Sequence, residues 1–109
     1  MFIHVACFRW NEGTGRDDVA AVASALGELP AAIPELRDYR FGPDARLTQG
    51  NHDFAVVAAF DDRDGYLAYA DHPAHLRVLT EVIRPRLAAR AAVQSVSYTH
   101  LTLPTICSV

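Results

Sequence analysis

The sequence predicts an α+β fold, a four-stranded sheet with elements in the order β-α-β-β-α-β and both helical regions packed on one face. Three observations lead to this expectation. Apolar runs typical of strands alternate with segments whose apolar residues recur at helical spacing, and prolines and glycines separate these segments. A chain of 109 residues is also long enough for one domain with one core. The element order is that of the ferredoxin-like split unit.

In the first part of the chain, strand-like residues run from Phe2 to Trp10. A glycine-rich turn follows, and Thr14 before an acidic first turn is predicted to be the N-cap of a helix. Apolar residues at three- and four-residue spacing extend this helix over residues 16–29, where Pro30 limits it. Residues 36–41 are expected to form the second strand.

The middle of the chain holds the clearest strand, residues 54–60, in which every side chain is apolar. The polar stretch before it, residues 42–53, is expected to cross the surface as a loop. A short helix is predicted over residues 64–70. Proline disfavours an α conformation in the residue before it, so His72 should be extended while Pro73 opens the next helix.

The helix that begins at Pro73 should turn one apolar side toward the sheet. Pro85 is expected to bend or fray its last turn, and residues 91–97 are expected to supply the fourth strand. The residues that mark the apolar side are Leu76, Leu79, Ile83 and Leu87.

The first and third strands are apolar on both faces, although two helices can cover only one face of a sheet. In the first strand, for example, Phe8 alternates with Cys7. An uncovered apolar face of this size is typical of an interaction surface. We therefore expect a homodimer whose two sheets pack face to face into a barrel-like core.

Composition and charge exclude several classes of partner. The net charge of -3 comes from interspersed acidic and basic residues, so no nucleic-acid partner is expected. No apolar run approaches the roughly 18 residues needed to span a bilayer. The first residues have no basic region and no cleavage site of a signal peptide, and we expect a cytoplasmic protein without a membrane partner.

No metal and no cofactor are expected. The spacing of His72 and His75 is not that of a metal-binding helix, and no carboxylate or cysteine is placed with them. Cys7 and Cys107 lie at opposite ends of the chain and form no close-spaced pair. The segment 13–15 continues without the third glycine of a dinucleotide fingerprint.

Several segments together resemble the stress-responsive A/B barrel domain, a family of small dimeric α+β barrels. The resemblance covers about residues 2–95 of a domain expected over residues 2–97, and it implies the fold more strongly than the function because this fold hosts several chemistries. Its most specific part is the His-Pro-x-His segment. The matching segments are residues 3–10, the link 33–37, the strand ending at Phe60, residues 69–75 and the pair Arg84-Pro85.

One branch of this family is a plant polyketide cyclase, which closes a linear polyketide by an intramolecular aldol reaction. His4, Tyr69 and His75 match three residues that surround its substrate. A tyrosine and a histidine of that branch correspond to Leu26 and Phe54 here, which leaves a smaller acid/base set. The resemblance implies that His75 removes a proton next to a carbonyl, Tyr69 donates to the oxyanion, and His4 orients the substrate or relays protons.

A small hydrophobic carbonyl or aromatic compound is the expected ligand, held in a cleft between helices and sheet. Small side chains at Ala6, Ala58 and Ala92 would leave room for it. An alternative for His72 is to cap the next helix, and an alternative for His75 is a half-buried structural histidine. Besides the three acid/base candidates, the residues expected to bind the ligand are Phe8, Leu26, Phe54 and His72.

Two functions compete with acid/base catalysis of the cyclase or isomerase type. One is non-enzymatic binding or interaction in a stress response. The other is a cofactor-independent monooxygenase of the antibiotic-biosynthesis type, which shares the dimeric fold. Whether the protein is an enzyme stays open at this level.

The end of the chain differs in character from the rest. From Ser95 on it is rich in hydroxyl groups and has no acidic or basic residue, and it resembles a tail appended to many unrelated translated sequences. Residues 98–109 are therefore expected to be non-native or disordered, and no function is drawn from His100 or Cys107. The alternative is a genuine extension of the last strand.

Overall fold

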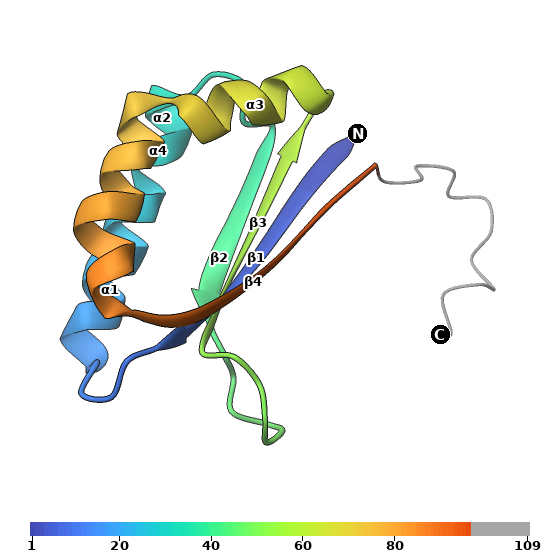
Figure 1. The fold of residues 1–109 in the computed structure, drawn as a ribbon. Helices are drawn as coiled ribbons and strands as arrows, with labels where there is room; N and C mark the ends of the chain where they lie inside the picture. The colour runs from blue at the N-terminus through green and yellow to red at the C-terminus, as the bar shows by residue number, and fades with distance from the viewer. Residues whose placement is uncertain (97–109) are drawn as a thin grey trace, which may run out of the picture.

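The computed structural model describes residues 1–96, so the expectations for the tail, residues 98–109, lie outside the described residues. Figure 1 shows two layers, a sheet and a set of helices that all lie on one of its faces. This is the predicted α+β arrangement. Within residues 1–96, no helix has both the length and the apolar character required to cross a membrane.

The sheet is antiparallel, with the strand order β2-β3-β1-β4. The central strands β1 (Phe2–Trp10) and β3 (Phe54–Phe60) have the predicted bounds. Strand β2 (Asp38–Pro43) flanks β3 at one edge, and β4 (Leu87–Val96) flanks β1 at the other.

Strand β2 lies two residues further along the chain than predicted. Leu36 is held in a turn, because its N–H donates to the carbonyl of Ile33 over 3.2 Å. At the other end, Pro43 still pairs with Phe54 of β3 and extends the strand.

Helix α1 (Arg16–Gly27) begins at the predicted residue, but its N-cap is Gly15 and not Thr14. The Asp18 carboxylate accepts the Gly15 N–H over 2.9 Å and so stabilises this first turn. The helix ends at Gly27, and a separate short helix α2 (Leu29–Ala32) follows. Pro30 is accommodated in the first turn of α2, where its missing N–H breaks no helical hydrogen bond.

The break at His72 and Pro73 is confirmed. Helix α3 (Arg63–Asp71) stops at His72, whose backbone is extended with φ -66° and ψ 134°. Pro73 is the first residue of α4 (Pro73–Val78). The chain then continues through a π-helical turn, η1 (Leu79–Ile83), and a 3₁₀ turn, η2 (Arg84–Arg86), which contains Pro85 as expected for a frayed helix end.

Strand β4 begins four residues earlier than predicted, and the placement of Leu87 on the helix is wrong. Leu87 is the first residue of β4 and pairs with Trp10. The N–H of Asn11 also donates to the carbonyl of Arg86 over 2.8 Å. Pro85 cannot continue a helix because it lacks a backbone N–H. The residues that follow Pro85 therefore pair with the end of β1.

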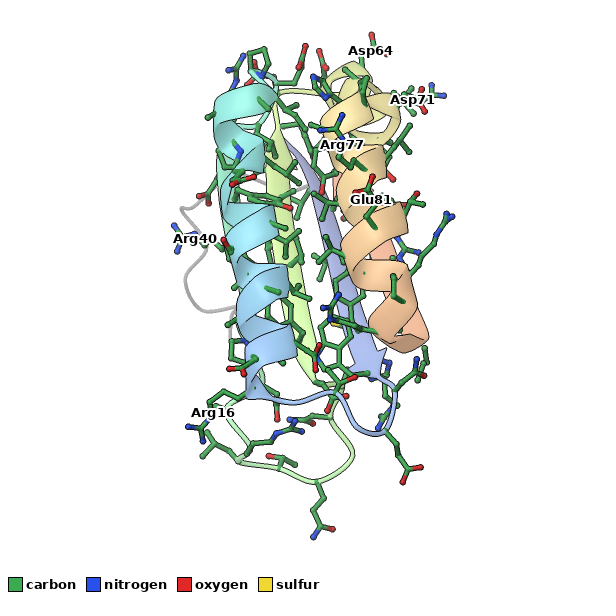
Figure 2. All side chains as sticks on the ribbon, turned by 90° about the vertical axis from the view of Figure 1, so that its left-hand side faces the viewer. Arg16, Arg40, Asp64, Asp71, Arg77 and Glu81 are labelled. Carbon is green, nitrogen blue, oxygen red and sulfur yellow. The ribbon has the colours of Figure 1, made fainter. Side chains whose placement is uncertain are left out.

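The core lies between the helical layer and the sheet. Charged side chains such as Arg77 and Glu81 lie on the outer surface of the helical layer (Figure 2). The largest fully buried side chains are Phe54, Phe60, Leu29, Ile33, Ile83 and Val22.

The opposite face of the sheet is apolar and uncovered in the protomer. Val57, Val5 and Val93 stand directly opposite one another on β3, β1 and β4. Val57 is 36% exposed and Val93 is 61% exposed. No helix of residues 1–96 lies on this side of the sheet (Figure 1).

Candidate functional site

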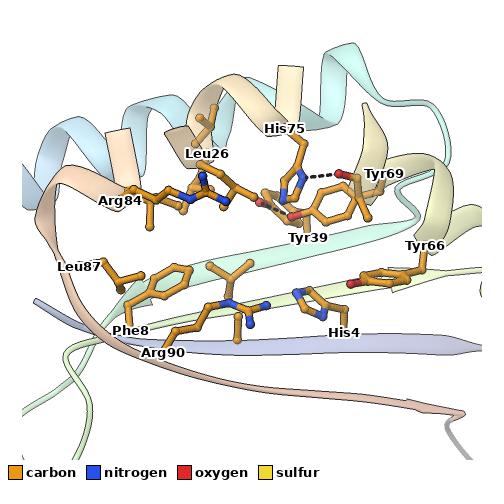
Figure 3. Close-up of a pocket in the computed structure, with 16 residues that line it drawn as sticks. His4, Phe8, Leu26, Tyr39, Tyr66, Tyr69, His75, Arg84, Leu87 and Arg90 are labelled. Carbon is orange, nitrogen blue, oxygen red and sulfur yellow. Dashed lines mark hydrogen bonds between the residues drawn. The ribbon is translucent and has the colours of Figure 1, made fainter. Parts of the chain in front are cut away.

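A cavity of about 300 Å³ lies between the inner face of the sheet and the helical layer. Its walls are largely apolar, with Phe8 and Val56 from the sheet and Leu26 from α1. Figure 3 shows polar side chains entering it from both layers. These side chains are His4, Tyr39, Tyr66, Tyr69, His75, Arg84 and Arg90.

His75 enters the cavity from the first turn of α4. Its Nδ1–H donates to the carbonyl of Ala70 over 3.2 Å. A carbonyl can only accept, so the neutral ring carries its proton on Nδ1 and leaves the lone pair on Nε2. Burial lowers the pKa of His75, and the positive charge of Arg90 lowers it further, while the bond to Ala70 acts in the opposite direction. At neutral pH His75 is therefore a neutral ring with a free basic nitrogen.

Tyr69 lies directly beside His75, with ring centroids 4.1 Å apart. It projects from α3 and is almost fully buried. Its hydroxyl lies 3.3 Å from the hydroxyl of Tyr39 on β2. Burial raises the pKa of both phenols, so both keep their protons at neutral pH. Two coupled hydroxyls leave one O–H free to donate to a ligand.

His4 projects from β1 on the opposite wall of the cavity. The side-chain amide of Gln94 on β4 donates to its Nδ1 over 2.8 Å, which places the ring proton on Nε2. Burial, followed by the charges of Arg90 and His75, lowers the pKa of His4 to about 4. His4 is therefore neutral at physiological pH and presents an N–H donor.

The structure brings together most of the residues that the sequence singled out. His4, Tyr69 and His75, the three acid/base candidates, all line the cavity. Phe8 and Leu26, expected to contact a ligand, line it as well.

Phe54, Ala58, His72 and Ala92 do not line this cavity, contrary to their expected place in the cleft. Phe54 is a core residue that stacks against Phe8. His72 caps α4, because its Nδ1 accepts the N–H of Ala74 over 3.1 Å. This capping is the alternative that the sequence left open for His72.

Several polar residues of the site were not proposed from the sequence. Tyr39 projects from β2, and its hydroxyl reaches that of Tyr69. Tyr66 lies one turn before Tyr69 on α3, a spacing that places both on one face. Arg90 and Gln94 share the inner face of β4, a pattern that becomes visible only once the strand starts at Leu87.

Among residues 1–96, no acidic side chain lines the cavity. Within residues 1–96, no three histidine, cysteine, aspartate or glutamate side chains come together as a metal ion would require. The site thus offers two neutral imidazoles, three phenols and two guanidinium groups. Such a set can accept a proton, donate hydrogen bonds to an oxyanion and attract negative charge.

Comparison with known proteins supports the fold. A sequence model described as the stress responsive A/B barrel domain matches residues 2–97. An uncharacterised protein of Streptomyces coelicolor is 35% identical over 77 residues, which cover 69% of this chain and 79% of that protein.

Two of the solved structures that are similar to this chain show the range of identity. The first is described as a dimeric ferredoxin-like protein of unknown function from Thermobifida fusca. It is 52% identical, with a TM-score of 0.82, and the match covers 88% of this chain and 90% of that one. The second is a hydroxynitrile lyase from Passiflora edulis, with 15% identity, a TM-score of 0.79, and coverage of 90% and 94%. At that identity only the fold is shared.

Proposed function

Because the chain belongs to the stress-responsive A/B barrel domain family, we propose that it is a homodimer that binds a small hydrophobic carbonyl compound in the cavity and transfers a proton next to the carbonyl. The cavity volume of about 300 Å³ is at the lower end of the range for small-molecule sites. One buried water occupies about 30 Å³ of liquid, so the cavity suits a ligand of about ten non-hydrogen atoms.

The observation that carries this proposal is the opposite tautomers of His75 and His4. The bond to Ala70 leaves Nε2 of His75 as an acceptor, and the bond from Gln94 leaves Nε2 of His4 as a donor. No described residue hydrogen-bonds to either Nε2. One cavity therefore offers a base and an N–H donor that need no rearrangement before reaction.

The step follows from these groups. Nε2 of His75 takes the proton from the carbon next to the carbonyl, and the electron pair of the broken C–H bond forms the enolate. The developing charge on oxygen accepts hydrogen bonds from the Tyr69 hydroxyl and from Nε2–H of His4. In a ligand with a carbon–carbon double bond beside that carbon, the enolate is conjugated, and return of the proton to the far end of the conjugated system is an isomerisation. Attack of the enolate carbon on a second carbonyl of the same ligand, with the proton passing to the new alkoxide, is a cyclisation.

The homodimer is supported by the apolar sheet face that carries Val5, Val57 and Val93. Pairing of this face with the same face of a second copy would remove its apolar side chains from water. The related Thermobifida fusca structure, at 52% identity, is described as dimeric.

Proton transfer can be measured without knowledge of the natural ligand. Phenylacetone is a small apolar ketone of suitable size, and exchange of its α-protons in D₂O can be followed by proton NMR. We expect the protein to accelerate this exchange, and His75→Gln to abolish most of the acceleration. His52→Gln is the matched control, because His52 lies outside the cavity.

The same experiment separates catalysis from binding alone. Saturable binding of phenylacetone, seen as shifts of cavity resonances, without faster exchange would favour a non-enzymatic binding protein. Equal exchange rates for the wild type, His75→Gln and buffer would contradict the assignment of His75 as a base.

A further inference from the structure

Two arginines of the cavity have no role in the proton transfer described above. Arg84 comes from η2 in the helical layer, and Arg90 comes from β4 in the sheet. Both line the cavity, and both are also exposed to solvent, so they stand where the cavity opens. Figure 3 shows the Arg90 guanidinium reaching toward His4, while Arg84 extends from the opposite layer.

Neither guanidinium is neutralised within residues 1–96. Arg84 and Arg90 form no salt bridge and donate no side-chain hydrogen bond there, whereas Arg86, close to both in sequence, pairs with Asp18 over 3.1 Å. No aspartate or glutamate of the described part of the chain lines the cavity. The N–H donors of both guanidinium groups are therefore available to a ligand.

The two positive charges dominate the electrostatics of the cavity. His4 and His75 are neutral at physiological pH because burial lowers the pKa of both, and Arg90 contributes to each shift. A concave site with apolar walls focuses the field of such charges on whatever binds inside. An anionic group between the arginines would be attracted by both.

We propose that the ligand of this cavity is an apolar carboxylic acid, bound as its carboxylate between Arg84 and Arg90. This inference rests on the proposed function and narrows its substrate class to keto acids, with the carbonyl beside His75 and Tyr69 and the carboxylate at the mouth. A guanidinium fork matches a carboxylate in geometry. Phosphate sites commonly use backbone N–H groups at a helix N-terminus, whereas neither Pro73 nor Ala74 of α4 lines this cavity.

Binding of phenylacetate and phenylacetamide, an acid and a neutral amide of the same size and shape, tests the inference by calorimetry. We expect the wild type to bind phenylacetate about tenfold more tightly than phenylacetamide. Arg90→Gln and Arg84→Gln should each remove most of this preference, because they should weaken the binding of phenylacetate much more than the binding of phenylacetamide. Arg77→Gln is the matched control, because Arg77 lies on the outer surface of α4 (Figure 2).

A second measurement, the pKa of His75, reports the negative charge of the bound ligand. A bound carboxylate offsets the field of Arg90, so phenylacetate should raise the pKa of His75 measured by NMR, and phenylacetamide should not. Equal affinity for acid and amide in the wild type would overturn the inference, as would failure to bind either. Phenyl phosphate binding about tenfold more tightly than phenylacetate would overturn the choice of carboxylate.

The experiments distinguish an error in the carboxylate assignment from an error in the proposed proton transfer. Phenylacetone carries no charge, so its exchange depends on His75 and not on an anionic group. Faster exchange with no preference for the acid would refute the carboxylate alone. Preference for the acid without exchange would refute the catalysis alone.

Discussion

The hydroxyl of Tyr39 on β2 lies 3.3 Å from the hydroxyl of Tyr69 on α3, although 30 residues separate them in the chain. For Tyr69 to donate to a ligand, its oxygen must accept the proton of Tyr39. In the proposed step Tyr39 is therefore a positioning residue, because it holds the Tyr69 hydroxyl in an orientation in which the proton of Tyr69 is free.

Substitutions in this pair should have unequal effects on catalysis. Tyr69→Phe removes a donor to the enolate oxygen and should lower the rate of phenylacetone exchange by about 100-fold. Tyr39→Phe leaves that donor in place but unoriented, and we expect a loss of only about fivefold. The rates are compared at saturating ketone, with circular dichroism to establish that both variants fold. A larger loss in Tyr39→Phe than in Tyr69→Phe would contradict these roles.

The pH dependence of exchange should report His75. Burial and Arg90 place its pKa below the ordinary 6.5, so the base is neutral and active at pH 7. Activity should fall only at more acidic pH, as the imidazole gains a proton. Arg90→Gln removes a positive charge and should move this fall to higher pH, which a profile of kcat/KM measures. Arg77→Gln should leave the profile unchanged.

Stability should decrease on mild acidification because of His4. Its pKa is about 4 in the folded protein, against 6.5 for an ordinary histidine, so the unfolded chain binds more protons between these values. Its contribution is complete above pH 6.5 and is lost as the pH falls toward 4, by up to about 3 kcal/mol. Urea unfolding at a series of pH values measures this.

The contribution of His4 can be isolated by substitution. In His4→Gln the dependence of stability on pH between 6.5 and 4 should become shallower, although His75 still contributes there. The aspartates with lowered pKa values, such as Asp18 and Asp53, titrate at still lower pH. An unchanged slope in His4→Gln would show that His4 is not the group that titrates.

The apolar face of the sheet should mediate dimerisation. Val57→Arg places a charge in the row formed with Val5 and Val93, and it should weaken the dimer by at least about tenfold. Sedimentation velocity at micromolar concentration measures the change. Leu76→Arg is the control, since Leu76 is an exposed leucine on the helical layer. A wild type that sediments as a monomer would refute the proposed homodimer.

The cap at His72 should be structural. His72→Ala leaves the N–H of Ala74 without its 3.1 Å partner and should cost about 1 kcal/mol of stability. His72→Ser restores a side-chain oxygen at the N-cap and should recover most of this loss. Thermal unfolding of the wild type, His72→Ala and His72→Ser measures these differences in stability.

Much of this architecture could be predicted from local sequence. The bounds of β1 and β3 follow from uninterrupted strand patterns, and the break at His72 follows from the covalent geometry of Pro73. The convergence of His4 with His75 could be predicted because one lies on the inward face of a strand and the other on the first turn of the helix that covers it. These are properties of periodicity and of allowed backbone angles, which the chain carries at each position.

Only the tertiary structure decided which partner His4 meets. Gln94 reaches His4 across 90 residues because β4 pairs beside β1 in a register that sets these two residues opposite each other. The same register brings Arg90 to the cavity, and β2 brings Tyr39 to Tyr69. The local periodicity of the sequence determines which face of a strand or helix a side chain occupies. The tautomer of His75 follows from its contact with Ala70, five residues earlier in the chain. The tautomer of His4 and the approach of Arg90 to the cavity depend on which strands become neighbours, and strand order and register are settled by packing of the whole core.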